Sequence, residues 1–124
     1  MININENIVA VETSAELKTV LEGDNKITKI YLAKDITLES GISILASKTE
    51  VTIDGLYPID GTGIIHTYTD MNSAGSGDAI GVRSASSIKV TLQNMNVVGR
   101  NYYGIIYVAE GTAYQNVVIE YKNL

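Results

Sequence analysis

The run Val51-Thr52-Ile53-Asp54-Gly55 alternates apolar and polar residues, and a similar run, Val90-Thr91-Leu92-Gln93-Asn94, follows 39 residues later (51 to 90). A third run, Val117-Val118-Ile119-Glu120-Tyr121, follows after another 27 residues (90 to 117). Alternation with a period of two is typical of β-strands that have one buried face. Repetition of one such strand along the chain predicts a solenoid, in which equivalent strands stack in successive coils.

Each of these strands follows a second short apolar strand that begins about nine residues upstream. These earlier strands begin near Ile42, Ile80 and Ile105. The repeating unit is therefore a strand, a turn and a second strand. The two intervals between repeats differ in length, and the Gly-, Ser- and Asp-rich stretch 70–78 lies in the longer one. We expect this stretch to be a loop inserted into one coil, and to account for most of the difference.

This repetition predicts an all-β fold, a right-handed, single-stranded parallel β-helix with a capping α-helix at its N-terminal end. We expect residues 1–124 to form one domain, with β-helix coils over 26–124, as a segment of a larger protein. A β-sandwich is the alternative, because it also contains many short strands. It would need frequent tight hairpins, whereas the sequence has one Pro, no Asn-Gly, and Asp-Gly only at 54–55 and 60–61.

A helix is expected before the strands, over about residues 12–23. The stretch Thr13-Ser14-Ala15-Glu16 has the capping-box pattern, in which a hydroxyl and a Glu side chain satisfy free backbone donors at a helix start. The apolar stripe of this helix consists of Leu17, Val20 and Leu21. We expect the stripe to cover the open end of the first coil, because an uncovered strand edge invites pairing with another chain.

The composition argues against several classes of partner. Nine basic residues stand against fourteen acidic ones, a formal charge of −5, and only two of the nine are Arg. Such a chain has no basic patch that could follow a nucleic-acid backbone. The absence of Cys excludes disulfides and thiolate metal sites. No apolar run approaches the length of a membrane span, and the first six residues lack the features of a signal peptide. We expect no nucleic-acid partner and no membrane insertion.

Four segments carry a resemblance to a known family. They are Ser14-Ala15-Glu16-Leu17-Lys18-Thr19-Val20-Leu21, Ile30-Tyr31-Leu32-Ala33-Lys34-Asp35-Ile36-Thr37-Leu38, Val51-Thr52-Ile53-Asp54-Gly55 and Leu92-Gln93-Asn94-Met95-Asn96-Val97. Together they resemble the pectate lyase-like adhesive domains of Gram-positive bacterial surface proteins, over most of the chain. The resemblance implies a right-handed parallel β-helix, an extracellular or wall-associated parent protein, and a binding or spacer role without catalysis.

The same fold is also used by polysaccharide lyases, which hold calcium with carboxylates and remove a proton with a basic residue. The candidate groups here are Asp54, Asp60, Asp70 and Asp78, with Arg83 or Arg100 as the base. Their spacing matches no ligand motif, and an Asp that precedes a Gly commonly satisfies the backbone of a turn. Asp70 and Asp78 are weak calcium candidates, because their loop lacks the alternating acids and closing Glu of a calcium loop. We expect no enzyme activity and no required cofactor, with calcium left open.

Histidine and asparagine side chains are expected to be structural. His66 is the only histidine, and triad or metal chemistry would need partners at defined positions, so we expect a solvent-facing or hydrogen-bonded His. Asparagines recur near the ends of the later coils, at Asn94, Asn96, Asn101, Asn116 and Asn123. Asn adopts the left-handed conformation of tight turns, and stacked Asn side chains hydrogen-bond along a β-stack.

All eight aromatic residues are Tyr, and five of them crowd the last quarter of the chain. The candidate ligand-binding residues are Tyr102, Tyr103, Tyr107 and Tyr114. Exposed Tyr offers contact area at low entropic cost. Alternation places Tyr107 on the opposite face from Ile106 and Val108, so some of these rings should point outward. The alternative, equally open, is that these rings and Tyr121 cover an edge that faces a further coil.

The sequence therefore predicts a non-catalytic module of a cell-surface protein that acts in adhesion or as a spacer. Its expected partner is a glycan or a ligand on a host or matrix surface, and its expected location is extracellular or cell-wall-associated. A polysaccharide lyase or glycosidase-related fragment is one alternative. Self-assembly is another, since the C-terminal coil that ends near Tyr121 has no cap and could pair with another copy.

Overall fold

The computed structural model of the chain describes residues 1–84, 87–111 and 114–124, except for the side chain of Asp60. In chain order the elements are β1 (Ile2–Asn3), β2 (Ile8–Val11), α1 (Ser14–Glu22), β3 (Lys29–Leu32), β4 (Ile36–Thr37), β5 (Ile42–Ser43), β6 (Glu50–Asp54), η1 (Pro58–Asp60), β7 (Thr67–Thr69), η2 (Ser76–Asp78), β8 (Ile80–Val82), β9 (Lys89–Gln93), β10 (Asn96–Val98), β11 (Ile106–Val108) and β12 (Val118–Lys122). Both η elements are 3-10 helices.

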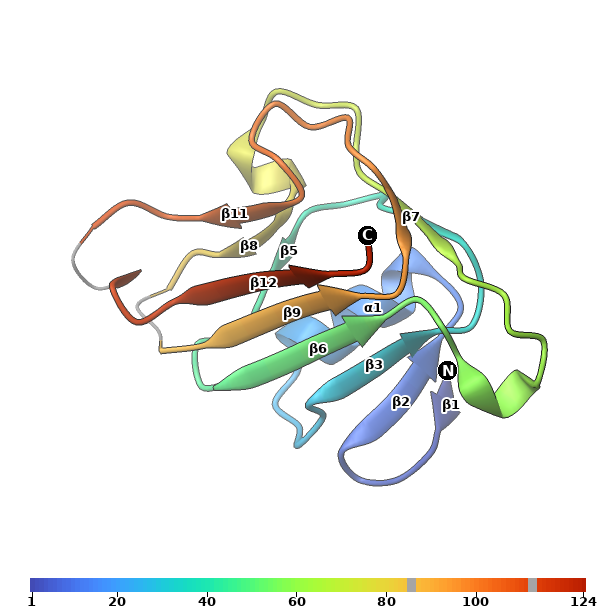
Figure 1. The fold of residues 1–124 in the computed structure, drawn as a ribbon. Helices are drawn as coiled ribbons and strands as arrows, with labels where there is room; N and C mark the ends of the chain where they lie inside the picture. Colours follow the sequence, from blue (N-terminus) through green and yellow to red (C-terminus); the bar gives the residue numbers. More distant parts are fainter. Residues whose placement is uncertain (85–86, 112–113) are drawn as a thin grey trace.

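Within these described residues the strands form three sheets, shown in Figure 1. Sheet A has the order β1-β2-β3-β6-β9-β12, sheet B has β4-β7-β10, and sheet C has β5-β8-β11. The chain visits sheets A, B and C in turn and then returns to sheet A. Every described pairing is parallel except that of β1 with β2. This arrangement is consistent with a pectate lyase-like β-helix and differs from a sandwich of antiparallel sheets.

The registers test the sequence alignment of the repeats. Val51 lies opposite Val90, which confirms the first alignment. The second alignment is wrong by two residues, because Ile119 and not Val117 lies opposite Val90. A slip of two residues leaves the alternation of faces unchanged, so periodicity alone could not detect the slip. The upstream strands of the repeat are β5, β8 and β11, and all three lie in sheet C, as the strand-turn-strand unit requires.

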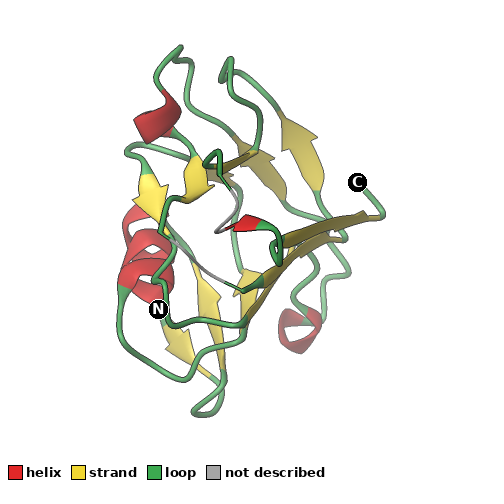
Figure 2. Ribbon diagram, turned by 90° about the vertical axis from the view of Figure 1, so that its left-hand side faces the viewer, coloured by secondary structure: helices red, strands yellow, loops and turns green. Residues whose placement is uncertain are grey.

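The first coil begins earlier than predicted. Strand β2 precedes α1 and pairs in parallel with β3, with Val9 opposite Ile30, so the expectation that the coils begin at residue 26 is wrong. The run Ile8-Val9-Ala10-Val11 is apolar throughout and shows no alternation. Its sequence pattern therefore did not identify it as a strand. Helix α1 is therefore the crossover between two parallel strands. Figure 2 shows it along one side of the molecule, beside the strands.

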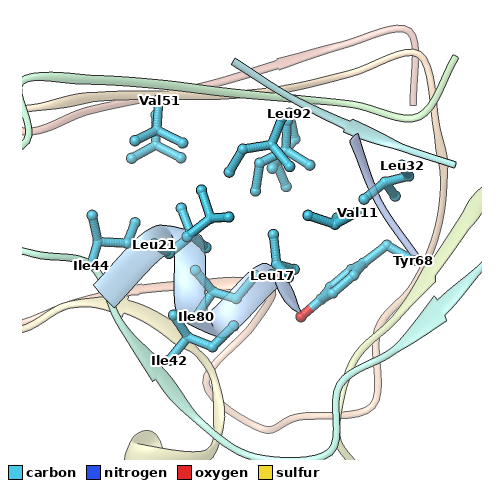
Figure 3. Close-up of a cluster of buried hydrophobic side chains, with 14 of the residues drawn as sticks. Val11, Leu17, Leu21, Leu32, Ile42, Ile44, Val51, Tyr68, Ile80 and Leu92 are labelled. Atoms are coloured by element: carbon cyan, nitrogen blue, oxygen red, sulfur yellow. The ribbon is translucent and has the colours of Figure 1, made fainter. Parts of the chain in front are cut away.

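The predicted cap of this helix is confirmed. The Thr13 side chain accepts a hydrogen bond from the Glu16 backbone N–H (3.1 Å), and Glu16 Oε1 accepts one from the Glu12 N–H (3.0 Å). The stripe residues Leu17, Val20 and Leu21 are all buried. Figure 3 shows Leu17 and Leu21 among core side chains of sheets A and C. The helix thus closes the apolar interior at the N-terminal end.

The coil from β6 to β9 is longer than the coil from β9 to β12, because it contains an insertion at a place that the sequence did not indicate. Residues 55–66 connect β6 to β7, whereas only 94–95 connect β9 to β10. The stretch 70–78 is a loop, as predicted, but its counterpart in the next coil, 99–105, is nearly as long. The expectation that 70–78 explains most of the difference is therefore wrong.

Turns at the end of sheet A strands use asparagine as expected. Asn94 and Asn123 both have positive φ (51° and 54°), a conformation that Asn tolerates well. The Asn123 side-chain amide donates to Asn94 Oδ1 (3.1 Å). Asn94 in turn donates to the buried carboxylate of Asp54 (3.3 Å). A polar ladder therefore joins the same corner of successive coils. None of the helices described here is long and apolar enough to cross a membrane.

Candidate functional site

Three tyrosine rings form a continuous strip on the outside of the last coil, on β11 and on the loop that precedes it. Tyr102 and Tyr103 meet edge to face at 5.3 Å between ring centroids, and Tyr103 and Tyr107 meet in the same way at 5.6 Å. Tyr102 is 83% exposed and Tyr103 is 43% exposed. We call Tyr102, Tyr103 and Tyr107 the tyrosine strip. Edge-to-face contacts hold aromatic rings in defined orientations, so the strip is an ordered aromatic surface.

Strand β11 turns Tyr107 outward. Ile106 lies opposite the core residue Ile80, whereas Tyr107 lies opposite Gly81 on the outer face of sheet C. The alternation expected from the sequence is confirmed here, since Ile106 packs against the core. The strip therefore begins on a strand, which fixes the backbone of its innermost residue.

Arg83 lies beside Tyr107 and connects three coils. Its two Nη atoms donate to the backbone carbonyls of Ile42, Ser76 and Ala79, the last at 2.8 Å. The Arg83 Cζ atom is 5.7 Å from the centroid of the Tyr107 ring, a distance typical of cation–π contacts. The guanidinium covers Gly81, where a Cβ atom would lie only 2.6 Å from Cζ. A glycine inside a strand often marks such a close approach, and this was the signal that sequence reasoning missed.

These contacts change the interpretation of Arg83. Its described hydrogen bonds go to backbone carbonyls and to Ser43 Oγ (3.2 Å), and it forms no described ion pair with the acidic candidates. A guanidinium held in this way supports the outer face of sheet C.

We expect Arg83→Lys to lower the free energy of unfolding by about 2 kcal/mol, because hydrogen bonds to charged groups contribute about 1.5–3 kcal/mol each. Lysine carries a single point charge and cannot reach the carbonyls of two coils at once. Denaturant unfolding followed by circular dichroism measures the change. An unchanged transition would mean that these carbonyl contacts contribute no net stability.

The loop that carries Tyr102 and Tyr103 packs on the corresponding loop of the preceding coil, between β7 and β8. The Tyr102 N–H donates to the Ser73 carbonyl (3.0 Å), and the side-chain amide of Asn101 donates to the Gly75 carbonyl (3.3 Å). Asn101 Oδ1 accepts from the Tyr103 N–H (2.8 Å). Figure 1 shows the two loops side by side. The positions of both rings therefore depend on residues about thirty positions earlier in the chain.

Asp70 and Asp78 shape this lower loop. Asp70 is buried, and its two oxygens accept from the Met71 N–H (2.9 Å) and the Asn101 N–H (3.3 Å). Burial raises the pKa of Asp70 above its usual value. Asp78 Oδ2 accepts from Ser73 Oγ (2.5 Å). No described contact joins Asp70 to Asp78, and no described group of three acidic or His side chains could hold a metal ion. Calcium binding at this loop stays a prediction.

Tyr114 and Tyr121 lie outside the tyrosine strip. The Tyr114 hydroxyl donates to the Arg83 carbonyl (2.7 Å), and its ring packs against the core. Tyr121 lies opposite Leu92 in β9, on the inner side of sheet A, and is 49% exposed. The tyrosines that the sequence grouped together therefore occupy three places: the outer strip, the edge of the core at Tyr114 and strand β12 at Tyr121.

The remaining candidates serve turns and loops. Asp54 accepts from the Leu56 N–H (2.9 Å) and from Gln93 Nε2 (2.8 Å), as expected for an Asp before a Gly. The side chain of Asp60 lies outside the described residues. Arg100 is exposed in the loop before the tyrosine strip.

His66 is hydrogen-bonded, as predicted. Its Nδ1 lies 3.2 Å from Asp35 Oδ1, which also accepts from the Thr67 N–H (2.9 Å). The hydrogen bond from Thr67, followed by that from His66, lowers the pKa of Asp35. The pair joins strands β4 and β7 of sheet B, because Asp35 directly precedes β4 and His66 directly precedes β7.

A polar pocket of about 180 Å³ lies between the turn after α1 and the turn before β6. Its buried Lys48 donates to Asn25 Oδ1 (2.7 Å) and to the Ile27 carbonyl (3.2 Å). Desolvation lowers the pKa of this Lys. The amine is fully engaged in joining the two turns, and the pocket contains none of the candidate tyrosines.

Comparison with known proteins agrees with this geometry. A family model described as a pectate lyase-like adhesive domain matches residues 8–124, beginning at the first residue of β2. No curated protein and no solved structure matches the chain. The matched span includes α1, the parallel strands β2 to β12 and the tyrosine strip. The chain belongs to the family of pectate lyase-like adhesive domains.

Proposed function

We propose that this chain is a non-catalytic adhesion module that binds a glycan through the tyrosine strip. The observation that carries this proposal is the edge-to-face series of Tyr102, Tyr103 and Tyr107, held against Arg83 on the outside of the last coil. The family name supports an adhesive role and leaves the ligand open.

A glycan fits the chemistry of this surface. Pyranose rings present flat faces of C–H groups, which pack on aromatic rings, while their hydroxyls reach the polar atoms at the ring edges. Tyrosine suits such a ligand because it combines a large apolar body with a hydroxyl. Tyr102 is strongly exposed and Tyr103 is nearly half exposed, yet edge-to-face contacts orient both rings, so binding would cost little conformational entropy.

The charge of the chain favours a neutral glycan over an acidic one. The net charge of −5 repels polyanions. Arg83, whose Cζ atom lies 5.7 Å from the centroid of the Tyr107 ring, already donates to backbone carbonyls through both Nη atoms, which leaves few donors for a carboxylate or sulfate. A neutral oligosaccharide or polysaccharide is not repelled by the net negative charge and does not need free guanidinium donors.

The proposed module is the right-handed form of the β-helix, because crossovers between parallel strands are right-handed in about 98% of cases. We place it outside the cell or on the cell wall, as part of a larger exported protein. A ligand on a host or matrix protein is the alternative partner, since exposed Tyr is also common in protein interfaces.

Binding to an array of neutral and acidic glycans, followed by calorimetry on the hits, tests this proposal. We expect Tyr103→Ala and Tyr107→Ala each to weaken binding at least about tenfold, equivalent to about 1.4 kcal/mol. Tyr31→Ala is the matched control, because Tyr31 lies on sheet A and stacks with Tyr57 (5.6 Å) far along the chain from the strip. This control should bind as tightly as the wild type.

Two results would contradict the proposal. The first is an absence of glycan binding at millimolar concentration, or equal affinities for the strip variants and the wild type. The second concerns catalysis and uses polygalacturonate with calcium. An increase in the absorbance of unsaturated products, lost in an Arg83→Ala/Arg100→Ala variant, would identify a lyase instead.

A further inference from the structure

The polar pocket between the turn after α1 and the turn before β6 is lined by two side chains, Asn25 and Lys48, that glycan binding does not use. Lys48 is only 6% exposed, and its Nζ donates to Asn25 Oδ1 at 2.7 Å. Because Oδ1 is bonded directly to Cγ, this contact places a buried amine beside the carbonyl carbon of an amide. An amine and a side-chain amide in contact are the reactants of an isopeptide bond.

Backbone hydrogen bonds hold both reactants in place. The Lys48 N–H donates to the Leu45 carbonyl (3.0 Å), and the Leu45 N–H donates to the Leu21 carbonyl in α1 (3.0 Å). Asn25 Oδ1 accepts from the Ile27 N–H (3.0 Å), which closes a turn of the kind that Asn side chains commonly make. Two groups held in reactive contact behave as if they were at a very high concentration. The fold therefore removes much of the entropic cost of their reaction.

The surroundings of Lys48 favour a neutral, nucleophilic amine. Within residues 1–84, 87–111 and 114–124, Lys48 forms no ion pair. Desolvation lowers its pKa, although the charge of Asp24 partly opposes this effect. A neutral amine has two N–H donors, which match the short contacts to Asn25 Oδ1 and to the Ile27 carbonyl (3.2 Å). The third contact, to the Asn25 carbonyl, is long (3.5 Å), so the lone pair of Nζ is available for attack.

The remaining contacts of the Asn25 amide suit its substitution. The Ile27 N–H that donates to Oδ1 would stabilise the negative charge that develops on this oxygen during attack, as the donors of an oxyanion hole do. On the other side, Nδ2 donates to the carbonyls of Val20 (3.1 Å) and Gly23 (3.2 Å). These acceptors favour a leaving nitrogen that carries additional protons. The amide is thus held with its oxygen at donors and its leaving group at acceptors.

We propose that Lys48 and Asn25 form an intramolecular isopeptide bond, which joins the turn before β6 to the turn before β3. These two strands are neighbours in sheet A. The bond would tie successive coils together covalently and close the chain from residue 25 to residue 48 into a loop. Such a closed loop has less conformational freedom when the chain unfolds, which favours the folded state. The proposal does not depend on glycan binding.

The chemical step balances without an added reagent. The lone pair of Lys48 Nζ attacks Asn25 Cγ and forms the new C–N bond. The bond between Cγ and Nδ2 then breaks, and its electron pair leaves with Nδ2. One proton moves from Nζ to Nδ2, so the products are a secondary amide and one molecule of ammonia. Asp24, the carboxylate whose charge acts on this amine, carries the proton. No oxidant, cofactor or second substrate is consumed.

Mass spectrometry of the intact, purified chain tests the proposal. We expect most molecules to be lighter than the mass calculated from the sequence by one molecule of ammonia. Peptide mapping with trypsin locates the bond, because trypsin does not cleave after a lysine whose amine is acylated. The digest should contain one branched peptide, in which residues 19–26 are joined to residues 35–83 with no cleavage after Lys48. Fragmentation of this peptide should place the branch at Asn25 and Lys48.

Three variants separate the roles of the residues. Lys48→Arg keeps a cation in the pocket, but a guanidinium stays protonated and does not attack, so this variant should have the full calculated mass. Asp24→Asn should reduce the linked fraction, because the proton carrier is lost. The matched control is Lys18→Arg, since Lys18 also joins α1 to a turn but donates to a backbone carbonyl, that of Gly41 (2.7 Å). This control should lose ammonia as the wild type does. Circular dichroism checks that each variant is folded.

Several results would overturn the proposal. A wild-type chain with the full calculated mass would exclude the bond. Loss of ammonia with normal cleavage after Lys48, or the same loss in Lys48→Arg, would indicate cyclisation of an asparagine onto the backbone instead. If Lys48→Arg does not fold, the peptide map of the wild type still decides between these two reactions. Equal linked fractions in Asp24→Asn and the wild type would exclude Asp24 as the proton carrier.

Discussion

Gly41→Ala is expected to lower the free energy of unfolding by about 3 kcal/mol or more, at the upper end of overpacking effects. A Cβ atom at Gly41 would lie 1.6 Å from the carbonyl oxygen of Gly77 and 2.7 Å from its carbonyl carbon. Both are backbone atoms, so no side-chain rotation can relieve the contact. The turn between β4 and β5 would have to separate from η2 in the next coil. Denaturant unfolding followed by circular dichroism measures the loss.

Gly77→Ala is the matched control for this contact. Its Cβ atom would meet nothing within 4 Å, and its φ is not in the left-handed region. The replacement reduces the entropy of the unfolded chain, so we expect no change or a gain of about 0.4–1 kcal/mol. The two glycines touch each other, yet only one of them lacks room for a side chain. Equal destabilisation by both replacements would contradict this account of the contact.

Leu21→Ala is expected to cost about 2–5 kcal/mol, because the side chain is completely buried and its removal leaves a cavity. Leu21 lies on the face of α1 that closes the first coil, among core residues of sheets A and C (Figure 3). Its backbone carbonyl also accepts from the Leu45 N–H (3.0 Å), which ties the helix to the segment after β5. Thermal or denaturant unfolding measures the effect.

Thr19→Ala on the exposed side of the same helix provides the comparison. The Thr19 hydroxyl donates only to the Ala15 carbonyl within the helix (3.0 Å), so we expect a change within about 0.5 kcal/mol. If Leu21→Ala were equally mild, α1 could not be the element that closes the core.

The sequence was most informative where local periodicity determines the structure. The alternation around Val51 and Val90 predicted two neighbouring strands in the correct register. The capping box predicted the start of α1 within two residues, and the apolar stripe predicted its buried face. In each case the residues that carry the signal are close together in the chain, and their spacing follows directly from strand or helix geometry.

Periodicity did not identify strands that lack alternation or are too short to show it, and it could not detect a shift of two residues. Strand β2 is apolar at every position, and its last three residues are all buried, so side chains on both faces are apolar and the sequence shows no alternation. The strands of sheet B have two or three residues, too few to show alternation, so the third layer was not recognised. The third repeat was misplaced by two residues, since the pattern is the same after such a shift.

The candidate site was predicted only in part for a similar reason. Alternation along β11 indicated that Tyr107 and Ile106 lie on opposite faces, and this is confirmed. The contact of Tyr107 with Arg83 joins residues of different coils, and the seating of Tyr102 on Ser73 does the same. Contacts between coils depend on the exact register and on the loop lengths. No local spacing in the sequence encodes them.

The order in which the chain visits its sheets also has a mechanical consequence. Backbone hydrogen bonds in the sheets run from coil to coil, so a pulling force between the two ends of the stack acts along these bonds. In this unzipping geometry the hydrogen bonds between one pair of coils would break before those of the next pair. In shear geometry all of them would have to break together. Each released coil, such as the one from Val90 to Ile119, would lengthen the chain by about 100 Å at most. A protein built on such coils would extend stepwise under tension, one coil at a time.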